Sequence, residues 1–118
     1  MKTLLTFLFA VVCFTSTHAQ QQVVQENEKL IYNDREFRVG DVIQLGYGSK
    51  QDKTFAFAHG CSRNKATGYL SPFYGGYRCE VLGWKTLKGK YLIKARPVGM
   101  KRRIFVDVQG AIDNKEML

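Results

Sequence analysis

The sequence predicts an all-β fold: a small antiparallel barrel or open sandwich of five to six strands with a short C-terminal helical turn. Short runs of alternating apolar and polar residues recur along the chain, as expected for half-buried strands. Glycines and an Asn-Asp pair separate these runs, which is typical of turns. No stretch shows the apolar spacing of a three-turn amphipathic helix. A small chain of this kind avoids exposed strand edges by closing its sheet fully or in part.

The first nineteen residues have the three-part pattern of a secretory signal. A basic start precedes an apolar run of about twelve residues, which is too short for a membrane-spanning helix of roughly 20. Thr17 and Ala19 are small residues at the expected cleavage site, so we predict cleavage after Ala19 and a secreted or periplasmic location. Residues 20–27 are then expected to form a flexible lead-in to one small domain, 28–118.

Three segments in the first half of the chain are predicted strands. Residues 28–32 form a short apolar run that ends at the turn signal Asn33-Asp34. Residues 36–48 contain two β-branched runs joined by a bend or bulge at Gly40-Asp41. Residues 53–60 alternate, with two phenylalanines on one face and small residues on the other.

Residues 60–76 show no periodicity and are predicted to form one long loop. The stretch GYLSPFYGGYRC (68–79) ends this loop and carries four aromatic side chains. Cys61 and Cys79 are the two cysteines beyond the predicted signal, and an even number in an exported protein favours a disulfide. Such a bridge stabilises by about 3 kcal/mol and would tether the loop. The alternative is two unpaired, buried thiols.

The second half of the chain reads as an antiparallel meander. Residues 77–84 are a strand with alternate apolar residues facing inward, and Gly89 marks a hairpin connection. Residues 90–98 alternate until a proline ends the strand or confines it to an edge. Residues 101–110 are the last predicted strand, and 111–117 form a single helical turn.

The segment VGDVIQLGYGS (39–49) resembles SH3-like barrels, in which a Val-Gly-Asp step marks a sharp bend into a strand. The chain also resembles small exported SH3-like β-barrel proteins of unknown function from Gram-negative bacteria. This resemblance implies an SH3-like barrel and supplies no mechanism. An OB-like barrel is the competing architecture.

Positive charge is concentrated in the second half of the chain. Without the predicted signal, 17 basic residues stand against 10 acidic ones, and residues 63–103 contain eleven Lys or Arg but one acid, Glu80. This asymmetry indicates an acidic partner. The alternative is a solvated basic face without a partner.

No catalytic or metal-binding arrangement is visible in the sequence, and we predict neither an enzyme nor a cofactor. His59 and Cys61 would share a strand face, as a Cys-His pair requires, but the predicted disulfide would remove the nucleophile. Beyond the predicted signal, one histidine and two distant cysteines have no metal-site spacing.

The residues best suited to a function are aromatic and basic. Flat rings stack on sugars or bases, and flanking cations hold anions. Loop rings that plug an open barrel end are the structural alternative. We therefore predict a monomeric, exported, non-catalytic binding module for an anionic glycan or other polyanion, with nucleic acid disfavoured by export. The alternative is a protein-interaction module, such as an inhibitor or accessory subunit, docking through residues 68–77. The predicted binding residues are Tyr69, Phe73, Tyr74, Tyr77, Arg78, Trp84, Lys101, Arg102 and Arg103.

Overall fold

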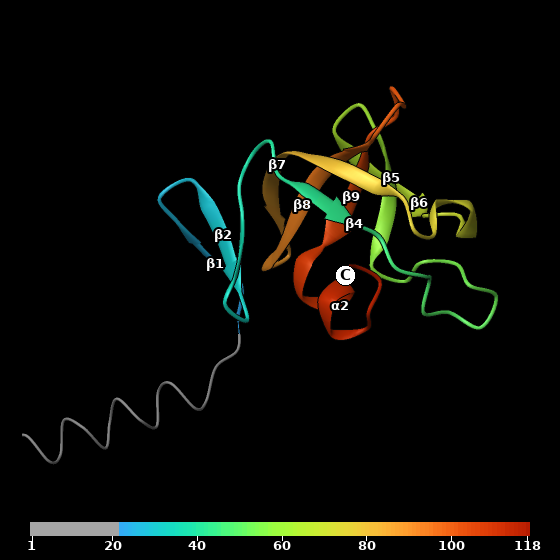
Figure 1. Ribbon diagram of the computed structural model, residues 1–118, viewed down its shortest axis with the longest axis horizontal. Coiled ribbons are helices and arrows are strands. Elements are labelled where there is room, and N and C mark those ends of the chain that lie inside the picture. The colour runs from blue at the N-terminus through green and yellow to red at the C-terminus, as the bar shows by residue number, and fades with distance from the viewer. Residues whose placement is uncertain (1–21) are drawn as a thin grey trace, which may run out of the picture.

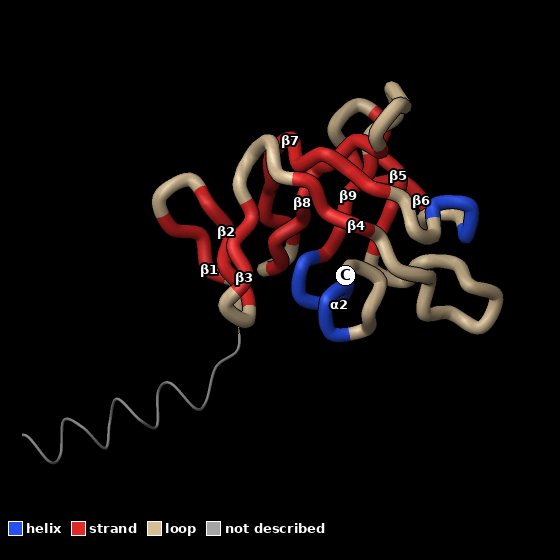
Figure 2. Tube along the Cα trace, in the orientation of Figure 1, coloured by secondary structure: helices blue, strands red, loops and turns tan. Residues whose placement is uncertain are grey.

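A computed structural model describes residues 22–118, which form two antiparallel sheets and a short C-terminal helix (Figures 1 and 2). The predicted signal and its cleavage site lie outside the described residues. The predicted all-β class is confirmed, with nine strands in the described chain. The strands are β1 (Val24–Glu26), β2 (Lys29–Tyr32), β3 (Arg35–Phe37), β4 (Val42–Gln44), β5 (Ala58–Ser62), β6 (Lys65–Tyr69), β7 (Arg78–Leu87), β8 (Lys90–Pro97) and β9 (Ile104–Asp107); the helices are η1 (Pro72–Tyr74) and α2 (Val108–Asp113).

The smaller sheet consists of β1, β2 and β3. Its second hairpin turns at Asn33 and Asp34, as predicted, and both adopt left-handed backbone conformations with φ of 50° and 63°. Residues 20–27 were predicted to be a flexible lead-in, but β1 pairs with β2 in register from Val24↔Ile31 to Glu26↔Lys29. Strand β1 was not predicted, because its short and largely polar sequence lacks a strand signal, whereas its partner β2 supplies the backbone hydrogen bonds.

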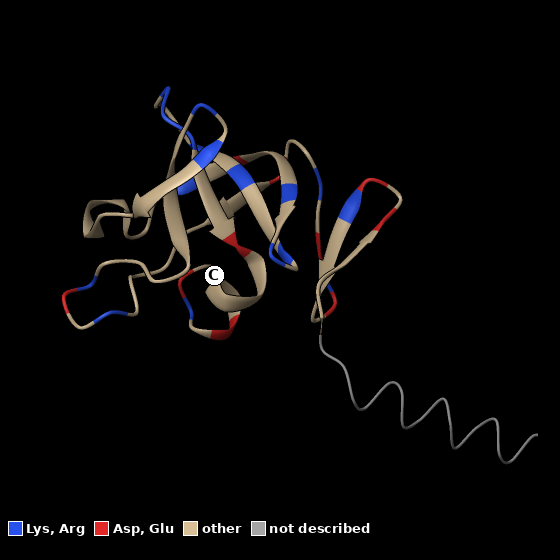
Figure 3. Cartoon of the chain, turned by 180° about the vertical axis from the view of Figure 1, so that it is seen from behind, with Lys and Arg blue, Asp and Glu red and all other residues tan. Residues whose placement is uncertain are grey.

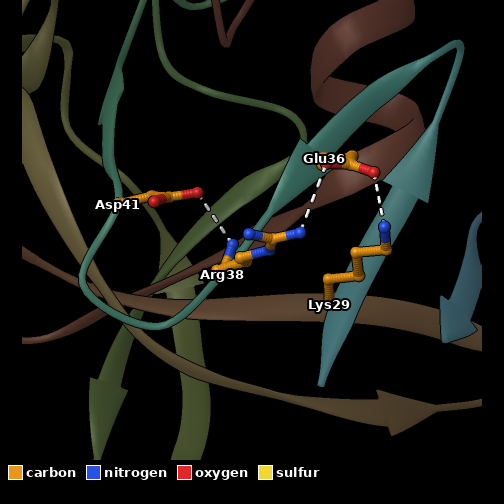
Figure 4. Close-up of polar contacts among 4 residues, drawn as sticks. All are labelled: Lys29, Glu36, Arg38 and Asp41. Carbon is orange, nitrogen blue, oxygen red and sulfur yellow. Dashed lines mark hydrogen bonds and ion pairs between the residues drawn. The ribbon is translucent and has the colours of Figure 1, made fainter. Parts of the chain in front are cut away.

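The predicted bend at Gly40-Asp41 is where the chain leaves the small sheet for the large one. Gly40 has φ of 95°, and its N–H donates to the carbonyl of Val81 in β7 at 2.8 Å. The Asp41 carboxylate accepts the Arg38 N–H at 2.9 Å, and Glu36 lies between Lys29 and the Arg38 guanidinium (Figure 4). The predicted strand 36–48 is therefore two strands in different sheets.

The larger sheet has six strands in the order β4-β7-β8-β9-β5-β6. Strands β7, β8 and β9 form the predicted meander, and the β7–β8 turn at Lys88 and Gly89 has φ of 51° and 78°. The outer edge of β4 is covered by the end of the chain: the Leu118 N–H donates to Gln44, and Leu45 bridges to Met117. The sheet ends at β4 and β6, which gives an open arrangement.

One face of the large sheet holds the core. Strands β7 and β8 bury alternate residues on this face, as their sequence periodicity predicts, whereas all four residues of β9 are buried. The small sheet shares this core through Leu30, Tyr32 and Phe37, and the Tyr32 hydroxyl donates to the Asp113 carboxylate of α2 at 2.8 Å. The large sheet adds Val81, Ile93, Ile104 and Val106 to this core, and Phe105 of β9 is fully buried outside it.

The C-terminal helix begins three residues earlier than predicted. Asp107 is its N-cap, and the Asp107 carboxylate accepts the Gly110 N–H at 3.3 Å. A side chain at Gly110 would overlap the ring of Phe57, so the helix packs closely on the segment before β5. No helix among residues 22–118 is long and apolar enough to cross a membrane.

The predicted strand 53–60 is wrong over its first half. Residues 53–57 lie outside any strand, and β5 begins at Ala58. Instead of pairing in a ladder, the N–H groups of Ala56 and Phe57 donate to the buried Glu116 carboxylate at 2.8 Å. The side chain of Glu116 thus accepts the backbone hydrogen bonds that the carbonyl groups of a neighbouring strand would otherwise accept.

The predicted long loop 60–76 is also wrong. Strands β5 and β6 form a hairpin, and Pro72–Tyr74 form a short helical turn that Ser71 caps. The hairpin turn consists of Arg63 and Asn64, with φ of 51° and 62°. No glycine marks this turn, so its sequence gives only a weak signal.

The predicted Cys61–Cys79 disulfide is absent, and both residues are free thiols. Cys79 of β7 lies between Ile43 of β4 and Pro97 of β8, whereas Cys61 of β5 pairs with Ala66 of β6. Strands β8 and β9 therefore separate the two cysteines in the sheet, and a disulfide needs Cα atoms within about 7 Å. Burial raises the pKa of the Cys79 thiol to about 12, which keeps it protonated.

We expect Gly48→Ala to destabilise the protein by about 2 kcal/mol, because a Cβ at this position would overlap the backbone of Lys53 and Thr54. Urea unfolding would measure the loss. Gly83→Ala is the matched control, since a Cβ at Gly83 meets nothing within 4 Å. Equal stabilities for the two variants would contradict the close approach at Gly48.

Candidate functional site: a basic band at one end of the large sheet

Two loops that are distant in sequence meet at one end of the large sheet. One is the β5–β6 turn, whose left-handed residues Arg63 and Asn64 project from the hairpin. The other is the β8–β9 loop, which follows Pro97 and turns at Gly99 with φ of 84°. Both loops lie at the top of the molecule in Figure 1. The predicted binding residues Lys101, Arg102 and Arg103 belong to the second loop and are exposed.

The first hollow lies between these two loops and is lined mainly by cations. It has a volume of about 340 Å³ and no acidic residue in its lining. None of the ion pairs among residues 22–118 involves the four cations of this hollow. The lining residues are Cys61, Arg63, Asn64, Lys101, Arg102 and Arg103.

Asn64 extends the positive surface along the sheet. Its backbone carbonyl accepts the Lys85 ammonium at 2.9 Å, and its side-chain oxygen accepts the Lys94 ammonium. Both acceptors are neutral, so the two lysines are oriented without being neutralised. Lys85 also lies 4.5 Å from the centroid of the Phe105 ring, a cation–π contact. We call Arg63, Lys85, Lys94, Lys101, Arg102 and Arg103 the basic band.

Negative charge is kept away from the basic band. Glu80, the one acid between residues 63 and 103, pairs with Arg96 at 3.3 Å. Most of the remaining acids lie on the small sheet, on and around α2, and on the loop before β5 (Figure 3). A surface of one sign attracts an oppositely charged ligand over distances up to the Debye length, about 10 Å at 0.1 M salt.

A second hollow adjoins the first and shares Cys61 and Arg102 with it. Its volume is about 410 Å³. Residues with hydroxyl side chains and glycines, which expose their backbone, form much of its wall. Tyr69 and Tyr74, two predicted binding residues, also line it. The remaining lining residues are Gly60, Ser62, Thr67, Gly68, Leu70 and Ser71.

The aromatic residues around η1 form one cluster with different exposures. Phe73, Tyr74 and Tyr77 pack with ring centroids 5.4 to 5.7 Å apart. Tyr74 is buried in the core, Tyr77 is half-buried, and Phe73 is 62% exposed. Tyr74 therefore fills the core, as the structural alternative expects. Phe73 instead presents an exposed ring, together with the ring of Tyr47, which lies against Gly75.

Tyr69 is exposed, but its ring is already in contact with other residues. The Lys50 ammonium lies 3.2 Å from the ring centroid, and the His59 ring lies 5.1 Å away. Burial lowers the pKa of the His59 imidazole, so the histidine adds no charge to this region at neutral pH. A ligand that stacked on Tyr69 would have to displace one of these neighbours.

Two predicted binding residues lie outside the two hollows. Trp84 is on β7 after a register shift between Val81 and Gly83, and it faces a separate cleft beside Arg38 and Val39. Arg78 is exposed at the start of β7 and lines neither hollow. Asn64, which positions Lys85 and Lys94, was not among the residues predicted from the sequence. The sequence feature that indicates a turn at Asn64 is the dipeptide Arg-Asn between the two short strands β5 and β6, since Asn tolerates left-handed turn positions.

The structure shows where the possible nucleophile and base that the sequence brings close together lie in the sheet. His59 and Cys61 are separated by a bulge in β5, with His59 opposite Tyr69 and Cys61 opposite Ala66. Cys61 contributes to the walls of both hollows. Residues 22–118 contain no cluster of three or more potential metal ligands.

Comparison of the chain with protein-family models, with curated proteins and with solved structures gives no match.

Proposed function

We propose that this protein is a binding module that holds a polyanion along the basic band. The observation that carries this proposal is the hollow between the β5–β6 turn and the β8–β9 loop, where four cations converge and no acid lines the wall. Charge-assisted hydrogen bonds from arginine to sulfate, phosphate or carboxylate groups are shorter and stronger than neutral ones. Residues 1–19 resemble a secretory signal, which favours a ligand met outside the cytoplasm.

Several features of the basic band favour a polymer over a single small anion. Six cations extend from the β8–β9 loop across the β5–β6 turn to the outer face of β7 and β8. A polymer with repeated charges would contact several of them at once and release its condensed counterions. A single anion would leave most of the cations unused.

We expect the protein to bind dextran sulfate and not uncharged dextran of the same length. The affinity should fall steeply with salt, with a slope of log K against log [salt] of about −3 if about four charges are contacted. Titrations by fluorescence or calorimetry at several salt concentrations between about 50 and 300 mM would measure the slope. Equal binding of dextran and dextran sulfate, or a slope near zero, would contradict the proposal.

A second candidate function uses the exposed aromatic cluster instead. Phe73 and Tyr47 are 62% and 72% exposed, and exposed aromatic side chains are frequent anchors in protein interfaces. A protein partner docked there would be lost on Phe73→Ala and would respond weakly to salt. The dextran sulfate interaction should be unchanged in the same variant, because Phe73 lines neither hollow.

A further inference from the structure

The second hollow differs chemically from the first, although they share two wall residues. Ser62, Thr67 and Ser71 bring three hydroxyl groups to its wall, and each hydroxyl can donate and accept a hydrogen bond. The Ser71 oxygen already accepts the Phe73 N–H at 3.2 Å, which leaves its proton free to donate. Such groups match the hydroxyls of a sugar, which also donate and accept.

The size of this hollow and its open backbone suit a sugar ring, which can bind without stacking on an aromatic side chain. About 410 Å³ lies within the range of small-ligand sites. A Cβ built on Gly68 meets nothing within 4 Å, so the backbone here is open to close approach. A ligand unit in this hollow lies next to Arg102, which also lines the first hollow.

The two tyrosines of this hollow are poorly placed to stack on a nucleobase. Tyr69 carries the Lys50 ammonium 3.2 Å from its ring centroid, and Tyr74 is only 7% exposed. Proteins that bind single-stranded nucleic acids rely on exposed aromatic faces, each contributing about 1–3 kcal/mol per base. The lining therefore favours a hydroxyl-rich ligand over a stacked base.

From these observations we infer that the polyanion is an acidic polysaccharide, with one sugar ring in the hydroxyl-lined hollow and its charged substituent in the hollow of Arg63 and Lys101–Arg103. This inference rests on the proposed function, because it assigns a ligand class to the same surface. It adds a separate role for Ser62 and Thr67: they recognise the sugar, whereas the cations recognise charge.

The test compares three polyanions of matched charge number: dextran sulfate, polyphosphate and oligo(dT). Each would be titrated against the protein and two variants, Thr67→Val and Ser62→Ala. We expect each variant to weaken dextran sulfate binding about 3- to 10-fold, the usual range for a lost hydrogen bond, and to leave polyphosphate binding unchanged. Thr86→Val is the matched control, because Thr86 is exposed on β7 and lines neither hollow.

The outcomes separate this inference from the proposed function. If all three polyanions bind but the variants leave dextran sulfate binding unchanged, the sugar subsite is wrong and polyanion binding stands. Tighter binding of oligo(dT) than of dextran sulfate would also overturn the subsite and indicate a nucleic acid ligand. If none of the three binds, the proposed function itself is wrong.

Discussion

Replacing Glu116 with alanine is expected to lower the free energy of unfolding by about 3–5 kcal/mol, a large part of the 5–15 kcal/mol that holds a typical domain folded. The carboxylate is fully buried and accepts four hydrogen bonds. Its Oε2 atom accepts from the Ser49 N–H, the Ser49 hydroxyl and the Ala56 N–H at 2.6–2.8 Å. Its Oε1 atom accepts from the Phe57 N–H at 2.8 Å.

The large effect follows from the groups that would lose their acceptor. Three of the four donors are backbone N–H groups of residues 49, 56 and 57, which no strand pairs. A buried donor without an acceptor costs about 1–3 kcal/mol. The backbone of Glu116 also accepts the Gly46 N–H at 2.8 Å, so this residue fastens the loop before β5 and the end of β4 to the C-terminus.

Glu116→Gln distinguishes this account from a simple loss of volume. The glutamine keeps one acceptor oxygen but turns an NH₂ group toward N–H donors, so we expect a loss of about 2–3 kcal/mol despite the nearly equal size. Glu80→Gln is the control and should cost less than about 1 kcal/mol, since its ion pair with Arg96 is half exposed. Thermal and urea unfolding would measure all three variants. A Glu116→Gln protein as stable as the Glu80→Gln protein would show that other contacts hold the loop.

Changing Lys101, Arg102 and Arg103 together to alanine is expected to weaken dextran sulfate binding about 100-fold at 0.1 M salt. Each contact with a flexible polyanion contributes about 0.7 to the magnitude of the slope of log K against log [salt]. Three contacts therefore raise the binding constant by about two powers of ten at this salt concentration. The slope itself should become shallower by about 2. The three side chains are exposed, so the fold should be retained.

The matched control removes the same charge elsewhere. Lys53, Lys88 and Lys115 have positive φ of 70°, 51° and 59°, a conformation that asparagine tolerates well, and none of them lines either hollow. We expect the triple asparagine variant to bind dextran sulfate within about threefold of the unmodified protein, because distant charges are screened. Equal weakening by the two triple variants would mean that net charge alone drives binding, which would contradict a localised basic band.

Local patterns along the chain predicted the features that depend on local interactions. The alternation in residues 77–84 and 90–98 gave strands β7 and β8 and their buried faces, because side chains of a strand point to opposite sides whatever its partner. Asn33-Asp34 and Gly89 gave two turns, because their left-handed backbone is a property of the residues themselves. The positive charge of residues 63–103 was likewise evident from the sequence.

Features that depend on contacts between distant segments were decided by the tertiary structure. The strand predicted at 53–57 does not form, because the Glu116 carboxylate, about sixty residues away, takes the N–H groups of that segment. The predicted disulfide does not form, because the strand order places β8 and β9 between β7 and β5. The basic band exists because the hairpin turn at Arg63-Asn64 and the loop at Lys101–Arg103 meet at one end of the sheet. Local propensity carries no information about which strands become neighbours, so the sequence predicted the strongly patterned strands, their turns and the charge, whereas strand pairing decided the remaining strands and the position of the candidate site.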